Sequence, residues 1–129
     1  MRARQHHNHR TVGIMGVGVV LLLLVSACAL LNQPPKPSIN IASGSPYGTA
    51  PLAITFDISE SRDPDGEIVS FAFDFGDGTD PVSQGTDLSQ PIKHTYEHVG
   101  QCLASLTVVD NTGEERRMQA PIILSEPAD

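Results

Sequence analysis

The stretch that decides the fold is Phe71–Thr79, which reads FAFDFGDGT. Its three phenylalanines fall on every second residue, a period that places three large apolar side chains on one face of a β-strand. The strand must end just after the last of them, because Gly76 and Gly78 readily adopt positive φ angles. Asp74 and Asp77 beside these glycines supply carboxylates that accept hydrogen bonds from turn amides. One stretch therefore predicts both a core strand and the turn that closes it.

Period-two segments recur on both sides of this stretch. The clearest is Leu52–Ile58, in which every second residue is a large hydrophobe, and Glu114–Leu124 gives a closing strand. The whole of Ser43–Pro51 is turn-forming. Further strands are expected at Ser38–Ala42, Ile68–Phe75, Pro91–Tyr96 and Gln101–Asp110, with a short edge strand near Pro81–Ser83. About seven short strands at roughly ten-residue spacing, without a helical period in this part of the chain, predict an all-β protein with a single antiparallel β-sandwich.

Core residues on the last two strands follow from the same period. Cys102, Ala104, Leu106 and Val108 share one face of the penultimate strand. The closing strand is expected to bury Met118, Ala120, Ile122 and the neighbouring Ile123.

The N-terminal residues have the layout of an export signal. Met1–Arg10 is basic without an acidic residue, and Thr11–Ala27 is an uninterrupted run of apolar or small residues. The sequence Val25–Cys28, VSAC, resembles a bacterial lipobox, in which the chain is cut before the cysteine and the thiol is acylated. We therefore expect a lipoprotein signal peptide at 1–27 and a lipidated, proline-rich tether at 28–36. The alternative is a retained transmembrane anchor over Val12–Leu31.

Either reading places the remaining chain outside the cytoplasmic membrane. The lipoprotein reading predicts that it is exported and lipid-anchored at the cell envelope, on the outer membrane or on the outer face of the cytoplasmic membrane. His6, His7 and His9 lie in the signal, so their metal-like clustering carries no weight. With Cys28 used for the lipid, Cys102 is the one cysteine left and has no partner for an intramolecular disulfide.

Charge limits the choice of partners. The whole chain has a formal net charge of −7, and loss of the three signal arginines leaves five basic against fifteen acidic residues, a net of −10. Nucleic-acid binding requires a basic surface, so a nucleic-acid partner is excluded. An acidic exported domain is instead suited to divalent cations.

Several segments together resemble the PKD domain, an immunoglobulin-like β-sandwich common in exported bacterial and archaeal proteins. They occur in the family's order and spacing: Gly48–Leu52, Phe56–Asp57, Ser61–Ser70, Phe73–Gly78, His94–Tyr96, Gly100 and Leu106–Gly113. The resemblance implies a PKD-like domain at 37–125, followed by a short C-terminal tail at 126–129.

Two positions depart from the family pattern. Phe73 stands where the family usually has tryptophan, an apolar exchange that retains a large core ring. Cys102 stands where tyrosine is usual. Either a neighbouring side chain fills that volume or the core is looser there.

The resemblance also implies a candidate calcium site. Some PKD domains of secreted collagenases bind Ca²⁺ through positions that correspond here to Asp63, Asp65, Asp110 and Asn32. Calcium takes several oxygen ligands, and a strongly acidic domain lowers its own repulsion by binding one. The alternative is that these aspartates only cap turns. An EF-hand is excluded, because Ile68 stands where that loop demands glycine.

Two other groups of residues resemble functional sites but have simpler explanations. Asp74 and Asp77 flank one tight turn, which favours capping over paired acid/base catalysis. His94, His98 and Cys102 are spaced by four and four, but their segment is predicted to be strand, loop and strand, which disfavours a zinc site. We find no Gly-x-Ser-x-Gly elbow and no nucleophile with a partner base.

The sequence therefore predicts a membrane-anchored lipoprotein with one non-catalytic PKD-like domain that binds a surface protein or a polysaccharide. The alternatives are a structural envelope component that acts as a spacer or assembly partner, and an accessory subunit of a secreted hydrolase. Fold-level analogy alone does not identify the ligand.

Overall fold

A computed structural model describes residues 31–83 and 85–129 of the chain. The predicted signal peptide and the predicted lipidation site Cys28 lie outside the described residues. The chain divides into two compact units, Met1–Asn32 and Gln33–Asp129. All strands and all core residues belong to the second unit, which thus contains a complete hydrophobic core.

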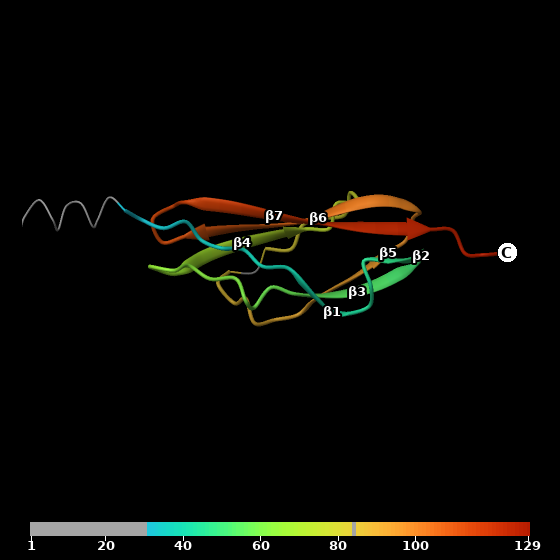
Figure 1. The fold of residues 1–129 in the computed structure, drawn as a ribbon, viewed down its shortest axis with the longest axis horizontal. Helices are drawn as coiled ribbons and strands as arrows, with labels where there is room; N and C mark the ends of the chain where they lie inside the picture. The colour runs from blue at the N-terminus through green and yellow to red at the C-terminus, as the bar shows by residue number, and fades with distance from the viewer. Residues whose placement is uncertain (1–30, 84) are drawn as a thin grey trace, which may run out of the picture. The chain divides into compact units, whose positions relative to one another are not determined.

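Seven strands form two facing sheets (Figure 1). One sheet has three strands in the order β1-β3-β5, and the other has four in the order β2-β7-β6-β4. The strands are β1 Asn40–Ser43, β2 Tyr47–Thr49, β3 Leu52–Asp57, β4 Ile68–Asp74, β5 Ile92–Tyr96, β6 Gly100–Asp110 and β7 Glu115–Ser125. The all-β immunoglobulin-like sandwich predicted from the sequence is confirmed. None of the described residues forms a helix that could span a membrane.

One local prediction was wrong and a second was confirmed only in part. The segment 43–51, expected to be turn throughout, contains β2, which pairs in parallel with the end of β7 while the other strand pairs are antiparallel. This strand is short and polar, and its partner lies far away in the sequence, so no local pattern marks it. The edge strand expected at 81–83 is a single bridge, in which Val82 and Phe73 exchange two backbone hydrogen bonds of 2.7 and 2.8 Å.

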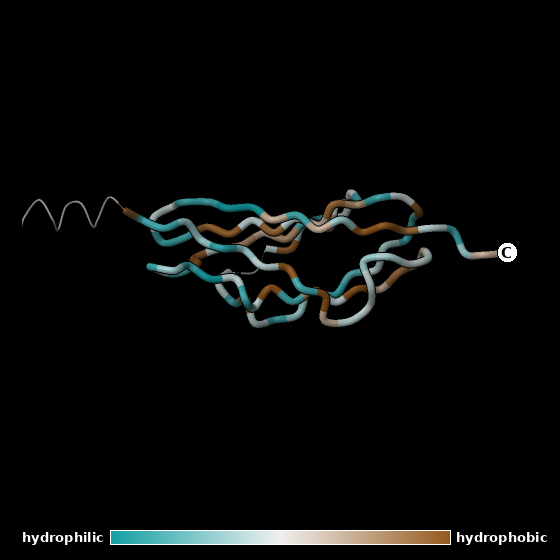
Figure 2. The backbone as a smooth tube through the Cα atoms, in the orientation of Figure 1, coloured by the Kyte–Doolittle hydropathy of each residue, from teal (hydrophilic) through white to brown (hydrophobic). Residues whose placement is uncertain are grey.

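Aromatic side chains from both sheets meet in the core. The rings of Phe56 on β3 and Phe73 on β4 are both fully buried, with centroids 4.8 Å apart, and Phe75 lies 5.4 Å from Phe73. Leu106 and Val108 on β6 are equally inaccessible to solvent. The alternation of hydrophobic and hydrophilic residues along the strands is visible in Figure 2. The three phenylalanines of Phe71–Thr79 face the core together, as their spacing predicted.

Two residues predicted to be in the core of β7 are exposed. Ile123 is 42% exposed because its neighbours Ile122 and Leu124 point inward, which turns Ile123 to the outer face. Met118 is 37% exposed, although it is four residues from the buried Ile122 and therefore faces the same side of the strand. The reason is that β2 pairs only with the last three residues of β7, so the first half of β7 is an uncovered edge strand.

Candidate functional site

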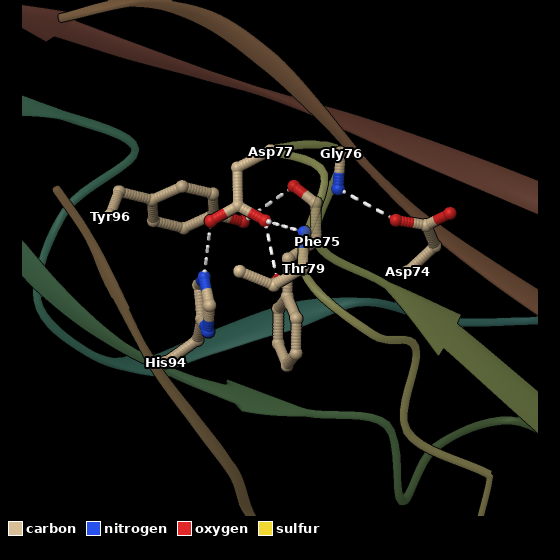
Figure 3. Close-up of polar contacts among 7 residues, drawn as sticks. All are labelled: Asp74, Phe75, Gly76, Asp77, Thr79, His94 and Tyr96. Carbon is tan, nitrogen blue, oxygen red and sulfur yellow. Dashed lines mark hydrogen bonds and ion pairs between the residues drawn. The ribbon is translucent and has the colours of Figure 1, made fainter. Parts of the chain in front are cut away.

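A buried tyrosine joins the two sheets at the turn that follows β4. Tyr96 on β5 is 1% exposed, and its hydroxyl donates a hydrogen bond of 3.0 Å to the carbonyl oxygen of Phe75 (Figure 3). Burial raises the pKa of Tyr96, and the nearby charge of Asp77 raises it further. The hydroxyl therefore remains a neutral donor, which holds the backbone of the turn against β5.

Asp77 is the polar centre of this turn. Its Oδ2 lies 2.6 Å from Nε2 of His94, and its Oδ1 accepts hydrogen bonds from the backbone N–H (3.2 Å) and the hydroxyl (2.6 Å) of Thr79 (Figure 3). The side chains of His94 and Asp77 are only 14% and 16% exposed. Burial raises the pKa of Asp77, but the hydrogen bonds from Thr79 and His94 outweigh it and hold that pKa below its usual value.

The imidazole of His94 is also fixed by two aromatic rings. It stacks on Phe75 with centroids 3.8 Å apart and an interplanar angle of 7°, and it meets Tyr96 edge-on at 4.7 Å. Two rings and one carboxylate thus leave the imidazole little freedom. Burial raises the pKa of the nearby Cys102 thiol, which favours its neutral form.

The predicted capping roles of this turn are confirmed, but one contact was missed. Asp74 accepts a hydrogen bond of 2.8 Å from the N–H of Gly76. Gly76 has a φ of 76°, and a Cβ atom there would collide with the carbonyl oxygen of Leu103. The contact of Asp77 with His94 on the other sheet was not predicted. The only hint in the sequence is the spacing of His94 and Tyr96, which are two residues apart and therefore face the same side of a strand.

A pocket of about 290 Å³ opens beside this cluster. Its walls come from the turn at Asp77, the end of β5 with Tyr96, the β5–β6 loop with His98, and the start of β6 with Cys102. His94, His98 and Cys102 accordingly lie on a strand, a loop and the next strand, as predicted.

The predicted calcium ligands come from two loops that contact each other. The loop before β4 and the β6–β7 turn are joined by hydrogen bonds from Asn111 N to the carbonyl of Glu67 (3.0 Å) and from Glu67 N to Asn111 Oδ1 (3.1 Å). Buried Asp110 uses Oδ1 to accept three hydrogen bonds of 2.7 to 2.9 Å from Thr112 and Glu114. Asp110 therefore caps its turn, which was the alternative reading of the sequence.

Asp63 has one unsatisfied oxygen. Its Oδ1 accepts a weak hydrogen bond of 3.3 Å from Asp65 N, whereas its Oδ2 is buried and has no hydrogen-bond partner among the described residues. Burial raises the pKa of Asp63, and the charges of Asp65 and Asp110 add to this effect. A Cβ atom at Gly66 would collide with Asn111 Oδ1 and lie 2.8 Å from Asp63 Oδ2, so two oxygens point at the space that Gly66 leaves open.

The loop does not form a complete metal cluster. No group of three His, Cys, Asp or Glu side chains placed to hold a metal ion occurs in residues 31–83 and 85–129. Asp65 Oδ2 accepts a hydrogen bond of 2.8 Å from the backbone N–H of Gln33, the first residue of the second unit. Asn32 belongs to the other unit, and its role as a ligand stays a prediction. Asn111, which sequence analysis assigned only to a turn, is the additional oxygen donor that the structure brings to this loop.

A third feature is an apolar patch on the outer face of the four-stranded sheet. Ile123 on β7 lies between Tyr47 on β2 and Gln101 on β6. Two residues along, Pro121 on β7 pairs with Leu103 on β6. The side chains of Tyr47, Ile123 and Leu103 are 63%, 42% and 45% exposed. We call Tyr47, Leu103, Pro121 and Ile123 the apolar patch. Sequence analysis missed it, because the position of Tyr47 depends on the unpredicted strand β2.

Comparison with known proteins identifies one family. The family model described as PKD domain matches residues 34–122. Collagenase ColQ1 of Bacillus cereus is 34% identical over 96 residues, which are 74% of this chain and 9% of that protein. Collagenase ColA of Clostridium perfringens is 42% identical over 62 residues, 46% of this chain and 5% of that protein. The chain thus spans less than a tenth of the length of either relative.

Solved structures agree with this family. The PKD1 domain of Vibrio anguillarum Epp has a TM-score of 0.56 and 27% identity, covering 74% of this chain and 99% of that one. A structure described for carbohydrate-binding modules of the β-sandwich superfamily has a TM-score of 0.60 and 27% identity, covering 74% of this chain and 36% of that one.

The Asp77–His94 pair predicts how stability depends on pH. A carboxylate whose pKa is lowered by folding stabilises the folded state above its unfolded pKa, about 3.9, and loses that contribution as the pH falls through the folded value. Asp77→Asn should therefore lower the melting temperature at neutral pH, and its deficit against the wild type should shrink below about pH 4. Thermal melting monitored by circular dichroism from acid to neutral pH measures this difference.

Asp80→Asn is the matched control, because it makes the same charge change in the same loop outside the cluster. The explanation is wrong if the deficit of Asp77→Asn is the same in acid as at neutral pH, or if Asp80→Asn reproduces it.

Proposed function

Because this chain belongs to the PKD domain family, we propose that it is a non-catalytic binding module that attaches to a polymer, either a polysaccharide or a surface protein, at the bacterial cell envelope. The observation that carries the proposal is the apolar patch.

The patch has the properties of a contact surface. Exposed apolar groups gathered on one face indicate interaction sites on soluble domains, particularly where polar groups surround them. Tyr47 provides a ring with a polar tip, which suits contacts to sugar rings and to extended polypeptides alike. Gln101 and Gln119 lie on the same face of the sheet and provide amide groups for hydrogen bonds.

The comparisons support the choice of a polymer as ligand. The relatives include proteins named collagenases, and one similar structure is described for carbohydrate-binding modules. Shared family membership favours a binding role for the domain. Which polymer is bound depends on the side chains of the patch and is open to direct test.

Binding should depend on the tyrosine of the patch. We expect the domain to co-sediment with an insoluble polysaccharide or with fibrous collagen, and Tyr47→Ala to weaken that binding about tenfold or more, because buried aromatic anchors commonly contribute 2 kcal/mol or more to an interface. The measurement is a depletion isotherm for each polymer. Tyr47 is 63% exposed in the free domain, so the substitution should leave the melting temperature nearly unchanged.

Val69→Ala is the control, because Val69 is an exposed hydrophobe on β4 outside the patch. Equal loss in both variants would contradict the role of the patch. Co-purification with an envelope complex, without retention on any polymer, would instead favour a structural envelope component.

We further propose that the loop before β4 binds calcium. The support is the buried, unpartnered Oδ2 of Asp63, with the charges of Asp65 and Asp110 close enough to raise its pKa. A divalent cation would neutralise this repulsion and fill the coordination of that oxygen. Asp63, Asp65 and Asp110, with the newly identified Asn111, would supply the oxygens, after rearrangement of the loop.

Calcium should stabilise the domain, and Asp63→Asn should separate the metal effect from turn chemistry. A ligand that binds only the folded state contributes about 2.7 kcal/mol at a concentration of 100 Kd. A raised carboxyl pKa destabilises the folded state at neutral pH, so Asp63→Asn should melt no lower than the wild type in chelator while losing the calcium-induced shift. Melting curves with calcium and with chelator give both quantities.

Asp87→Asn is the matched control, since Asp87 makes the same turn contact, with Ser89, away from this loop. The calcium proposal fails if neither chelator nor excess calcium moves the wild-type midpoint. It also fails if Asp63→Asn retains the full shift.

We also propose that the chain is exported and lipid-anchored through Cys28. The support is the N-terminal sequence, in which a basic segment is followed by an apolar segment and then by VSAC. Labelled palmitate should be incorporated by the wild type and not by Cys28→Ser in growing bacteria, while Cys102→Ser should be labelled normally. Equal labelling of the wild type and Cys28→Ser would refute the anchor.

A further inference from the structure

The pocket beside Tyr96 exists because the inward row of β6 ends in a small side chain. Ala104, Leu106 and Val108 of that row are fully buried, whereas Cys102 at its end is only partly covered. Cysteine is too short to fill the space between the turn at Asp77 and the β5–β6 loop. The opening of about 290 Å³ lies at this place.

Both apolar and acidic residues line the pocket. Tyr96, Cys102 and Val99 contribute apolar surface, and Val99 is 49% exposed. Asp77 and Glu97 contribute carboxylates and His98 an imidazole, and no lysine or arginine lines the space. Carboxylates accept hydrogen bonds and repel anions.

We propose that this pocket binds one aromatic ring that carries a hydrogen-bond donor, a group of the phenol class. A closed apolar cavity of about 150 Å³ already admits benzene, so the space is sufficient for one substituted ring. The ring would contact the thiol of Cys102 and the aromatic edge of Tyr96, both favourable neighbours for an aryl group. Its hydroxyl would donate a hydrogen bond to a carboxylate that lines the pocket.

The thiol of Cys102 reports on occupancy when it is alkylated at alkaline pH, where part of it is thiolate in spite of its raised pKa. In the unit Gln33–Asp129, which contains the complete core, Cys102 is the single cysteine. p-Cresol should slow its alkylation by iodoacetamide about threefold at a concentration of twice Kd, because two thirds of the pockets are then filled. Benzoate, a ring with an anionic group, should give much weaker protection.

A second arm distinguishes the two sources of such a ring. Protection by N-acetyltyrosinamide as well as by p-cresol indicates a tyrosine side chain of a protein partner, whereas protection by p-cresol alone indicates a small phenol. Both results support the phenol-class pocket. An alkylation rate that does not change at saturating concentrations of either probe overturns it.

Substitutions locate the effect. p-Cresol should raise the melting temperature of the wild type and of Cys102→Ser, which keeps the pocket, but not of Cys102→Phe, which fills it. Val99→Trp places a larger side chain at an exposed position of the pocket lining and should also weaken the protection of Cys102 by p-cresol. The test therefore does not depend on the folding of Cys102→Phe.

An equal thermal shift in Cys102→Phe and wild type contradicts the proposal. Tyr47→Ala should retain full protection, which separates this pocket from the apolar patch.

Discussion

The hydrogen bond from the Tyr96 hydroxyl to the Phe75 carbonyl is the constraint on which this end of the molecule depends. It joins the last residue of β5, in one sheet, to the turn that ends β4 in the other. With Tyr96 fixed, the imidazole of His94 lies between two rings and meets Asp77, and the turn cannot move away from the core. The pocket beside it is therefore bounded by rigid elements on the sides formed by β5 and the turn, which is the condition for selective binding of a small group.

Aspartates shape nearly all the turns of this acidic domain, and one of them departs from the common pattern. Asp57, Asp74, Asp77, Asp87 and Asp110 each accept a hydrogen bond of 3.2 Å or less from the backbone N–H two residues on. Asp63 makes the same contact only at 3.3 Å and buries its second oxygen without a partner. Because an unpaired buried carboxylate oxygen is costly, this departure distinguishes a candidate ligand site from ordinary turn chemistry.

Most of the sandwich could be predicted because its long strands carry a local period. The spacing of Phe71, Phe73 and Phe75 predicted a core strand, and the glycines after them predicted its end. Prediction failed where pairing is long-range. Nothing in Tyr47–Thr49 indicates that it will add to the end of β7, and the exposure of Met118 depends on how far that short strand extends. The apolar patch was missed for the same reason, since it forms only when β2, β6 and β7 lie side by side.

The amino-acid sequence by itself determined the all-β class, the core face of β4, the capping aspartates and the membership of the PKD family, because these depend on residues close together in the chain or on motifs in a fixed order. Only the tertiary structure decided that Asp77 pairs with His94, that Asn111 joins the loop of Asp63, and that Cys102 leaves a pocket beside Tyr96. Each of these features requires residues from distant segments to meet, across the two sheets for Asp77 with His94 and for Cys102 with Tyr96, and at one end of the four-stranded sheet for Asn111. Their geometry is fixed by packing in three dimensions, which no local pattern of residues records.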